Sequence, residues 1–388
     1  MNMKYKLKDI FDLQMGKTPS RNNTEYWNTE EHKWISIADL TKTGKYISET
    51  KECLSDCAID DSGIKVIPAN TVVMSFKLSI GKTAITAEDM YSNEAIMAFH
   101  DKHVAEILPE YIYYMFKYKN WDEGSNKAVM GKTLNKATLS EVEIDICSLE
   151  EQREIVKVLD KMMTVLGSRE TELSLLDNLI KARFVEMFSK INVDWKEVTM
   201  ADICKDMRTG PFGSALHHDE FVDKGIFVLG IDNAVENKFS YNRMRYITEE
   251  KYEKLKRYTV HPGDVIITIM GTVGRSAVIP ENMPKAINTK HLACLTPDTH
   301  IVDSYFLVNV FQVHPLIRKQ LESQSKGAIM NGLNLTIIKG LKFRLPPLEL
   351  QKEFVEFYKQ VNKSKVAVQK ALDETKLLFD SLMQQYFG

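Results

Sequence analysis

The sequence of 388 residues lacks a long apolar segment. Its longest apolar run, near Val265–Met270, falls far short of the ~20 residues that a membrane-spanning helix requires. The amino-terminal stretch MNMKYKLKDIFDLQ also has no apolar core of the kind found in signal peptides. We therefore expect a cytoplasmic protein without a membrane partner.

Cysteines are few, and their spacing suits neither a disulfide framework nor a zinc site. Five is an odd number for so long a chain. Cys53 and Cys57 lack a second Cys or His pair at zinc-site spacing, and His100 and His103 have no further ligands near them. Reduced, buried thiols are expected, and no metal ligand is predicted. The remaining cysteines are Cys147, Cys204 and Cys294.

Catalytic and nucleotide-binding motifs are also missing. Three Gly-Lys-Thr triplets occur, but the glycine that a phosphate-binding loop needs five residues earlier is replaced each time, by Phe11, Phe76 and Asn126. No GxGxxG follows a predicted strand, and no Asn-Pro-Pro-aromatic, Asp-Pro-Pro-aromatic, GxSxG or HExxH motif occurs. Asp264 precedes a predicted strand without a following Glu-x-Lys and is interpreted as a turn residue. The sequence predicts a non-catalytic chain that binds no cofactor itself.

An excess of charge of either sign is absent too. The 51 Lys and Arg residues nearly balance the 53 Asp and Glu residues, which leaves a net charge of −2. Bulk electrostatics therefore do not indicate a nucleic-acid partner, and local patches must provide that evidence. The length allows two or three domains.

Two stretches with a heptad pattern are present instead, at Leu149–Phe188 and Leu348–Phe387. Apolar residues recur at the a and d positions of both, in registers that match after an offset of 199. The pattern predicts two long helices that pair with each other; the alternative is that each helix covers only its own domain. Polar seam residues such as Arg183 and Lys365 can fix the register. The predicted seam residues are Ile155, Leu159, Met162, Leu166, Leu173, Leu176, Ile180, Phe354, Tyr358, Val361, Val368, Leu372, Phe379 and Leu382.

The segments before the two helices repeat each other. Short strand-like runs at 34–38 and 69–73 return at 227–231 and 263–267, and Leu134-Asn135 returns as Leu333-Asn334. The sequence thus predicts an α+β protein with two tandem α/β domains, separated by two long antiparallel coiled-coil helices with pseudo-twofold symmetry. The predicted boundaries are 1–148 for the first domain, 149–188 for the first helix, 189–346 for a connector and the second domain, and 347–388 for the second helix.

Several loops in both halves combine basic residues with Gly, Asn and Ser. Lys and Arg neutralise phosphates, and Asn, Gln and Arg can make bidentate contacts with purine edges, so these loops are candidates for binding duplex DNA. For any single residue an ordinary solvated turn is an equal alternative. The candidate DNA-binding residues are Lys17, Thr18, Ser20, Arg21, Asn22, Asn23, Lys82, Lys127, Lys132, Asn135, Lys136, Arg208, Thr209, Phe212, Ser214, Arg243, Arg245, Arg275, Lys290, Lys326, Asn331 and Asn334.

The run Leu345-Pro346-Pro347-Leu348-Glu349-Leu350-Gln351 precedes the second long helix, and Ser148-Leu149-Glu150-Glu151-Gln152 precedes the first. With these motifs and the repeated layout, the chain resembles the specificity (S) subunit of type I restriction-modification systems over its full length. The first copy departs from the motif, since Cys147-Ser148 replaces the two prolines.

The resemblance implies that each globular domain reads one half of a bipartite, asymmetric DNA site and that the helices act as a spacer. It implies two adenine-N6 methyltransferase subunits as partners, which bind S-adenosylmethionine, and restriction subunits that use ATP and Mg²⁺. A helix of about 40 residues is roughly 60 Å long, against about 34 Å for one turn of B-DNA. Two rivals stay open: a DNA-modifying enzyme or nuclease with an unrecognised active site, and a purely structural coiled-coil adaptor.

Overall fold

The computed structural model describes residues 3–388 except 28, 78, 122–133, 190–193, 213–214 and 326–332. It forms two compact units, one made of Met1–Glu170 with Lys370–Gly388 and the other of Thr171–Gln369. The sequence pattern divides the chain at the ends of the long helices, whereas these units divide it within them. No helix in the described part of the chain has the length and apolarity needed to cross a membrane.

The first unit contains a mixed five-stranded sheet in the order β2-β9-β6-β7-β4, a three-stranded sheet in the order β5-β3-β8, and the pair β1-β10. The strands are β1 (Met3–Lys6), β2 (Phe11–Met15), β3 (His32–Ile35), β4 (Tyr46–Ile47), β5 (Glu52–Leu54), β6 (Val72–Ser75), β7 (Thr83–Thr86), β8 (Tyr91–Ser92), β9 (Ile96–Asp101) and β10 (Glu143–Ile146). The short helices are α1 (Leu7–Ile10), α2 (Ile37–Lys42), α3 (Asp56–Ser62), α4 (Pro109–Tyr118) and α5 (Lys136–Ser140).

The larger sheet of this unit is buried on both faces, as its central strand shows. Val72 and Met74 of β6 join the main core cluster, which includes Phe116 of α4. Val73, which points to the opposite face, joins a second cluster with Ile35. A strand buried on both sides reads as a continuous apolar run, which is how β6 appears in the sequence.

The second unit repeats this topology with a four-stranded sheet in the order β12-β19-β16-β17, a second sheet in the order β14-β13-β18-β15, and the pair β11-β20. Its strands are β11 (Glu197–Thr199), β12 (Cys204–Thr209), β13 (Ile226–Leu229), β14 (Tyr246–Ile247), β15 (Thr259–Val260), β16 (Val265–Thr268), β17 (Ser276–Val278), β18 (Ala286–Asn288), β19 (Leu292–Pro297) and β20 (Lys342–Arg344). The helices are α7 (Glu249–Leu255), α8 (Ser304–Val313), α9 (Pro315–Ser325) and α10 (Leu335–Gly340).

The two units therefore share one strand plan, which confirms the predicted duplication. In both, the first strand pairs antiparallel with the strand just before the long helix, as β1 with β10 and β11 with β20. Each smaller sheet contains one parallel pair, β3 with β8 and β13 with β18. They differ at the edges, because β4 extends the larger sheet of the first unit and β15 extends the smaller sheet of the second. The α+β fold with tandem domains is confirmed.

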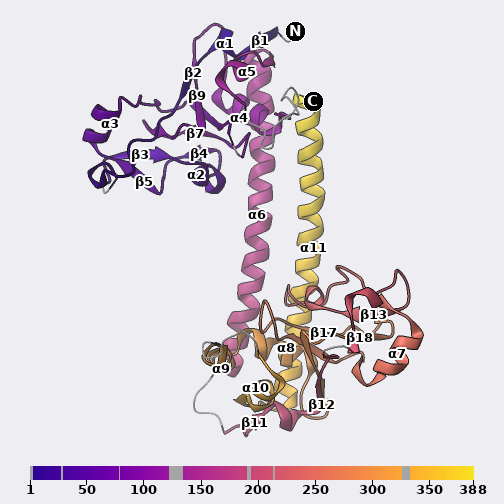
Figure 1. The fold of residues 1–388 in the computed structure, drawn as a ribbon. Helices are drawn as coiled ribbons and strands as arrows, with labels where there is room; N and C mark the ends of the chain where they lie inside the picture. Colours follow the sequence, from indigo (N-terminus) through magenta and orange to yellow (C-terminus); the bar gives the residue numbers. More distant parts are fainter. Residues whose placement is uncertain are drawn as a thin grey trace. The chain divides into compact units, whose positions relative to one another are not determined.

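The long helices α6 (Leu149–Phe188) and α11 (Leu348–Phe387) span the ranges that the heptad pattern predicts. In the first unit, Ile155 near the start of α6 shares a core cluster with Met383 near the end of α11. In the second unit, Ile180 near the end of α6 shares a cluster with Phe354 near the start of α11. Within each unit the two helices thus run antiparallel, as predicted, and Figure 1 shows them side by side.

The seam between the helices is assembled from the predicted residues, all of which are buried or half-buried. The seam residues nearer the helix ends also join the core clusters of the globular parts: Ile155, Leu159, Phe379 and Leu382 in the first unit, and Leu176, Ile180, Phe354, Tyr358 and Val361 in the second. The helices therefore pair with each other, as predicted, and the alternative that each helix covers only its own domain is wrong. Arg183 pairs with Glu353 at 3.1 Å across the seam, and Lys365 pairs with Asp177. These ion pairs help to define the register.

The glutamine of the helix-start motif has the same role in both units. Gln152 and Gln351 are fully buried. The Gln351 side chain donates to the carbonyl oxygens of Ile301 (3.1 Å) and Pro346 (2.9 Å) and accepts from the N–H of Asp303 (3.0 Å). Gln152 makes three equivalent bonds at the start of α6. Each glutamine thus ties the start of a long helix to the loop that leads into α4 or α8.

Candidate nucleic-acid interface

A loop that begins at Gly16 follows β2 in the first unit and packs against the chain at the end of β8. A Cβ atom at Gly16 would lie 2.2 Å from the carbonyl oxygens of Ser92 and Asn93, so only glycine fits there. The N–H of Lys17 donates to the carbonyl of Ser92 at 2.8 Å, and the indole of Trp34 donates to the carbonyl of Lys17 at 3.1 Å. The predicted residues Lys17, Thr18 and Ser20 are thereby held at the end of the sheet.

Arg21 lies in the same loop and is held by an aromatic ring and a carboxylate. Its guanidinium is 3.7 Å from the ring centroid of Trp27 and makes two hydrogen bonds to the Glu52 carboxylate, at 2.6 and 3.1 Å. The indole of Trp27 in turn donates to the carbonyl of Ser20 at 3.0 Å. Both Arg21 and Asn22 remain exposed, so the loop presents to solvent an amide and a guanidinium that is held in place and paired with a carboxylate.

The second unit builds the same arrangement after β12. A Cβ atom at Gly210 would lie 2.2 Å from the carbonyl oxygen of Asn288. Phe212 of this loop is 60% exposed, and Lys290 is exposed on the turn between β18 and β19. Sequence-distant candidates, 209–212 and 288–291, thus meet at one end of the sheet, in the same place as 17–23 and 92–94 in the first unit.

Buried polar atoms without partners mark this turn in both units. Ser92 Oγ in the first unit, and Asn288 Oδ1 and Thr289 Oγ1 in the second, are buried and make no hydrogen bond to any described residue. Most buried polar groups in proteins are paired. The equivalent turns of the two units thus share this feature.

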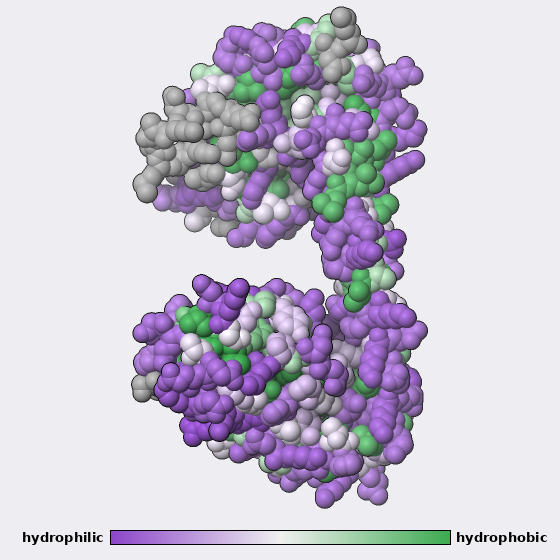
Figure 2. Space-filling model, turned by 90° about the vertical axis from the view of Figure 1, so that its right-hand side faces the viewer, coloured by the Kyte–Doolittle hydropathy of each residue, from purple (hydrophilic) through white to green (hydrophobic). Residues whose placement is uncertain are grey.

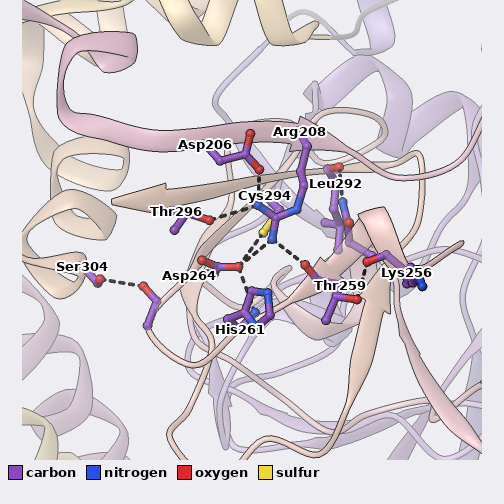
Figure 3. A network of polar contacts seen from close by, with 12 residues as sticks. Asp206, Arg208, Lys256, Thr259, His261, Asp264, Leu292, Cys294, Thr296 and Ser304 are labelled. Carbon is purple, nitrogen blue, oxygen red and sulfur yellow. Dashed lines mark hydrogen bonds and ion pairs between the residues drawn. The ribbon is translucent and has the colours of Figure 1, made fainter. Parts of the chain in front are cut away.

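Arg208 lies away from that end and is engaged inside the domain, as Figure 3 shows. Its guanidinium bonds to the carboxylates of Asp264 (2.9 Å) and Asp206 (2.6 Å) and to the carbonyl of Thr259 (2.5 Å). Asp264 also accepts from the N–H of His261 at 2.9 Å, in the turn that the sequence predicts. Burial raises the pKa of the neighbouring Cys294 thiol well above its usual value. The structure thus gives Arg208 an internal bridging role.

The other candidate arginines of the second unit divide into paired and unpaired groups. Arg245 makes an ion pair with Asp232 at 2.6 Å. Arg243 and Arg275 are exposed and form no ion pair with a described residue. Arg243 adopts a φ of 54°, in the left-handed region that non-glycine residues rarely occupy. Two free guanidinium groups are thus available to an external anion or base.

Several remaining candidates have intramolecular roles. The hydroxyl of Thr18 donates to the carboxylate of Glu94, and this hydrogen bond lowers the pKa of Glu94. Lys82 donates to the hydroxyl of Thr41. Asn135 and Asn334 are the N-cap residues of α5 and α10, each accepting from a backbone N–H at 2.8 Å.

The last candidates are surface residues or lie outside the description. Lys136 is exposed on α5, and Asn23 caps a short helical turn by accepting from the N–H of Glu25 at 3.1 Å. Contact of the candidates with DNA stays a prediction. Those outside the described residues are Lys127, Lys132, Ser214, Lys326 and Asn331.

Sequence reasoning missed the residues that hold these loops in place. Trp27 and Glu52 hold Arg21, and Asp232 and Asn233 hold the loop that carries Arg243. The sequence contained one signal for these supporting turns. The Ser-x-x-Asp spacing of Ser36-Ile37-Ala38-Asp39 predicts the capping box that forms after β3. Its counterpart after β13 is Gly230-Ile231-Asp232-Asn233.

One group of side chains has a spacing compatible with a metal ion. Glu31, His32 and Asp56 bring ligand atoms within 4.8 Å of one another. The ring of His32 lies 2.7 Å from the Asp56 carboxylate, and that carboxylate is largely exposed, so a simple surface hydrogen bond explains the contact. We assign no metal to it.

Comparison with known proteins identifies the family. The model of the type I restriction modification DNA specificity domain matches residues 2–174 and again 192–375. The specificity subunit of the type I restriction enzyme MjaIX from Methanocaldococcus jannaschii is 24% identical, with 97% of this chain and 90% of that protein aligned. The EcoprrI specificity subunit from Escherichia coli is 22% identical, with 89% and 84% aligned.

Solved structures have the same fold. The S subunit of a type I restriction-modification system from M. genitalium matches with a TM-score of 0.57 and 15% identity, covering 100% of this chain and 96% of that one. A chain from a structural study of complex assembly and conformational transition of the type I R-M system matches with a TM-score of 0.64 and 18% identity, covering 100% and 97%. Because the specificity-domain model matches both halves of the chain, this protein belongs to the family of type I restriction-modification DNA specificity proteins.

Proposed function

We propose that the chain is the DNA sequence-recognition subunit of a type I restriction-modification complex. Each globular domain reads one half of a bipartite, asymmetric site. The observation that supports this most directly is the repetition of one strand plan with different loops, because equal frames with unlike loops suit two unlike half-sites. The exposed cations at equivalent ends of the two sheets provide the charge that DNA binding needs.

The chain has no catalysis of its own in this proposal. Two adenine-N6 methyltransferase subunits supply S-adenosylmethionine and the reaction, and restriction subunits, where present, use ATP and Mg²⁺. The complex acts in the cytoplasm, where the chromosome lies. The rival enzyme function has a direct test: the purified chain, incubated with DNA, Mg²⁺ and S-adenosylmethionine but without partners, should neither methylate nor cleave the DNA.

The paired helices serve as a spacer between the two domains. Their antiparallel pairing in both units, with ion pairs across the seam, supports this role, because two helices locked together resist bending better than one. A fixed separation of the domains fixes the number of unread base pairs between the half-sites.

The helices also offer apolar surface for partner subunits. Leu175 is 62% exposed on α6, and Val366 and Leu377 are 70% and 71% exposed on α11. Figure 2 shows hydrophobic groups on the helical region amid a mostly hydrophilic surface. Exposed apolar groups on a helix pair suit further helices from a partner, which supports a scaffold role for methyltransferase subunits.

A domain exchange tests the proposal. Residues 196–346 are replaced by the corresponding segment of another specificity subunit, and methylated adenines are mapped after expression with the partner methyltransferase. We expect one half-site to change while the other half-site and the spacer stay the same. A change in both half-sites would contradict the assignment of one half-site to each domain.

A further inference from the structure

A loop in the second unit, residues 234–245, presents an unpaired arginine in an unusual backbone conformation. It leads from the turn after β13 to β14 and exposes Tyr241 (43%), Asn242, Arg243 and Met244 (53%). One cation, one amide and two large apolar side chains are thus exposed together on a single loop.

The loop is rigid although it lacks regular structure, because a buried asparagine holds it from below. Asn233 is fully buried. Its amide donates to the carbonyl oxygens of Ser240 (2.8 Å) and Asn242 (3.3 Å), and its own carbonyl accepts from the N–H of Gly230 (2.8 Å). These bonds fix the backbone on both sides of Tyr241. Because the carbonyl of Asn242 is held, the backbone position of the next residue, Arg243, is set by the fold.

Aromatic packing and a second set of hydrogen bonds fix the rest of the loop. The rings of Phe239 and Tyr241 meet edge to face at 5.0 Å, and Tyr241 stacks on Phe227 at 6.4 Å. Asn237, which also has a positive φ of 60°, accepts a hydrogen bond from Gln312 at 3.0 Å through its backbone carbonyl. The loop is thus held at its start and at its centre.

The conformation of Arg243 points to a function of its side chain. A φ of 54° is easier for Gly or Asn than for Arg, and such strain persists where the surroundings impose it, often at binding sites. The side chain forms no ion pair with a described residue. The loop backbone at Arg243 is thus held by the fold, while its guanidinium is exposed and available to a ligand.

The neighbouring Arg245 has a different role from Arg243, because it forms an ion pair within the protein. Arg245 closes the loop by pairing with Asp232 at 2.6 Å, and its side chain is only 24% exposed. Its charge is therefore already compensated. Arg245 is a positioning residue, whereas Arg243 is the group that can reach a ligand.

We propose that Arg243 reads a guanine of the second half-site by donating two hydrogen bonds to its O6 and N7 atoms. This inference rests on the proposed function. A guanidinium fork matches those two acceptors in the major groove, and this is the commonest specific contact between arginine and a base. The apolar neighbours Tyr241 and Met244 favour contact with a base edge over contact with a phosphate. Apolar side chains can pack on the bases and on the thymine methyl group in the major groove, whereas phosphates are charged and well hydrated.

The test uses the full chain in complex with its methyltransferase subunits and a duplex pool randomised at both half-sites. Arg243→Gly removes the side chain but keeps a residue that adopts positive φ readily, so the loop should survive. Arg243→Lys keeps the charge and removes the fork. Lys254→Ala, which removes one exposed cation from α7 in the same unit, where it pairs with Glu250 at 2.7 Å, is the charge control. A thermal unfolding midpoint equal to that of the wild type shows that Arg243→Gly folds.

We expect Arg243→Gly to lose its preference for guanine at one position of one half-site by about 10-fold or more, with Arg243→Lys showing a reduced preference. The other half-site and Lys254→Ala should keep the wild-type preferences. Two results would overturn the inference: unchanged preferences, or a uniform loss of affinity for all sequences, which would mean a phosphate contact. A wild-type complex without any base preference would instead refute the proposed function itself.

Discussion

At the scale of single residues, the buried glutamines explain why the start of each long helix carries a recognisable motif. A side-chain amide can satisfy two carbonyl groups and one N–H at once, and Gln351 does so in the core of the second unit. A shorter or apolar side chain would leave these backbone groups buried and unpaired. The motif is therefore a requirement of the joint between globular domain and helix and is independent of DNA.

Gln351→Ala should lower the free energy of unfolding by about 2–4 kcal/mol, because buried backbone groups lose their partners. Urea unfolding followed by circular dichroism measures this value. Gln360→Ala, an exposed glutamine of the same helix, is the control and should change it by less than about 0.5 kcal/mol. Equal stabilities of the two variants would show that the three bonds contribute little.

His314 should make the second unit sensitive to acid. It is 5% exposed beside Phe184 and Phe343, and burial lowers the pKa of its imidazole. An unfolded histidine has a pKa of about 6.5, so as the pH falls below this value the unfolded chain binds a proton that the folded chain does not. Stability is then lost as the pH falls from about 6.5 towards the lower folded pKa.

Replacing His314 by Phe should reduce this loss, by at most about 1.4 kcal/mol per pH unit. Urea unfolding at several pH values between 8 and 5 measures the slope for the wild type and the variant, and the values near pH 8 serve as the reference. Identical slopes below about pH 6.5 would mean that His314 takes up its proton equally in the folded and unfolded states.

At the scale of elements, the ion pair between Lys365 and Asp177 should contribute to the pairing of α6 with α11 in the second unit. Lys365 is 27% exposed and Asp177 51%, so we expect a coupling of about 0.5–1 kcal/mol. A double-mutant cycle with Lys365→Ala and Asp177→Ala, measured by urea unfolding in low and high salt, gives this value. A coupling near zero in low salt would assign the register to the apolar seam alone.

The long helices and the buried strands could be predicted from sequence because their periodicity is strong. A stripe of 40 residues leaves little doubt about helix ends, and β6 and β13 are continuous apolar runs. The short edge strands β4 and β15 carry no such signal, since two residues have no period. Their different pairing in the two units depends on tertiary packing, which a sequence pattern does not contain.

Which of the candidate binding residues have partners inside the protein could not be predicted from sequence, because residue type does not reveal the partner of a side chain. Arg208 and Arg243 look alike in sequence, yet Arg208 bridges the buried Asp264 and the exposed Asp206, whereas Arg243 is exposed and forms no ion pair with a described residue. Asn135 and Asn334 occupy equivalent positions in the two units, as the repeat predicts, and each is the N-cap residue of a helix. What decides these roles is contact between residues that are far apart in the sequence: Arg208 bonds to Asp264, 56 positions away, and to Thr296, 88 positions away.

At the scale of the whole molecule, the proposed spacer can be shortened without disturbing the heptad pattern. Deleting one heptad from each helix, residues 168–174 and 368–374, removes about 10 Å from both. At 3.4 Å per base pair, we expect the unread spacer to shorten by about three base pairs with both half-sites unchanged. Mapping of methylated adenines in cells that express the variant with its methyltransferase measures this.

Deleting residues 168–174 alone is the informative control. It shifts the a and d positions of α6 by one heptad against α11, so ion pairs such as Arg183 with Glu353 lose their partners and the protein should be less stable. If the double deletion is stable and the number of unread base pairs is unchanged, the long helices do not set the spacing between the half-sites.

The strand pairs β1-β10 and β11-β20 fasten the entrance of each globular part to its exit. A gene segment bounded by the two long-helix regions therefore encodes one complete globular domain, including both strands of its terminal pair. Crossing-over between related genes within those regions would transfer an intact globular domain, and with it a different half-site, in a single recombination event, while the long helices stay the same.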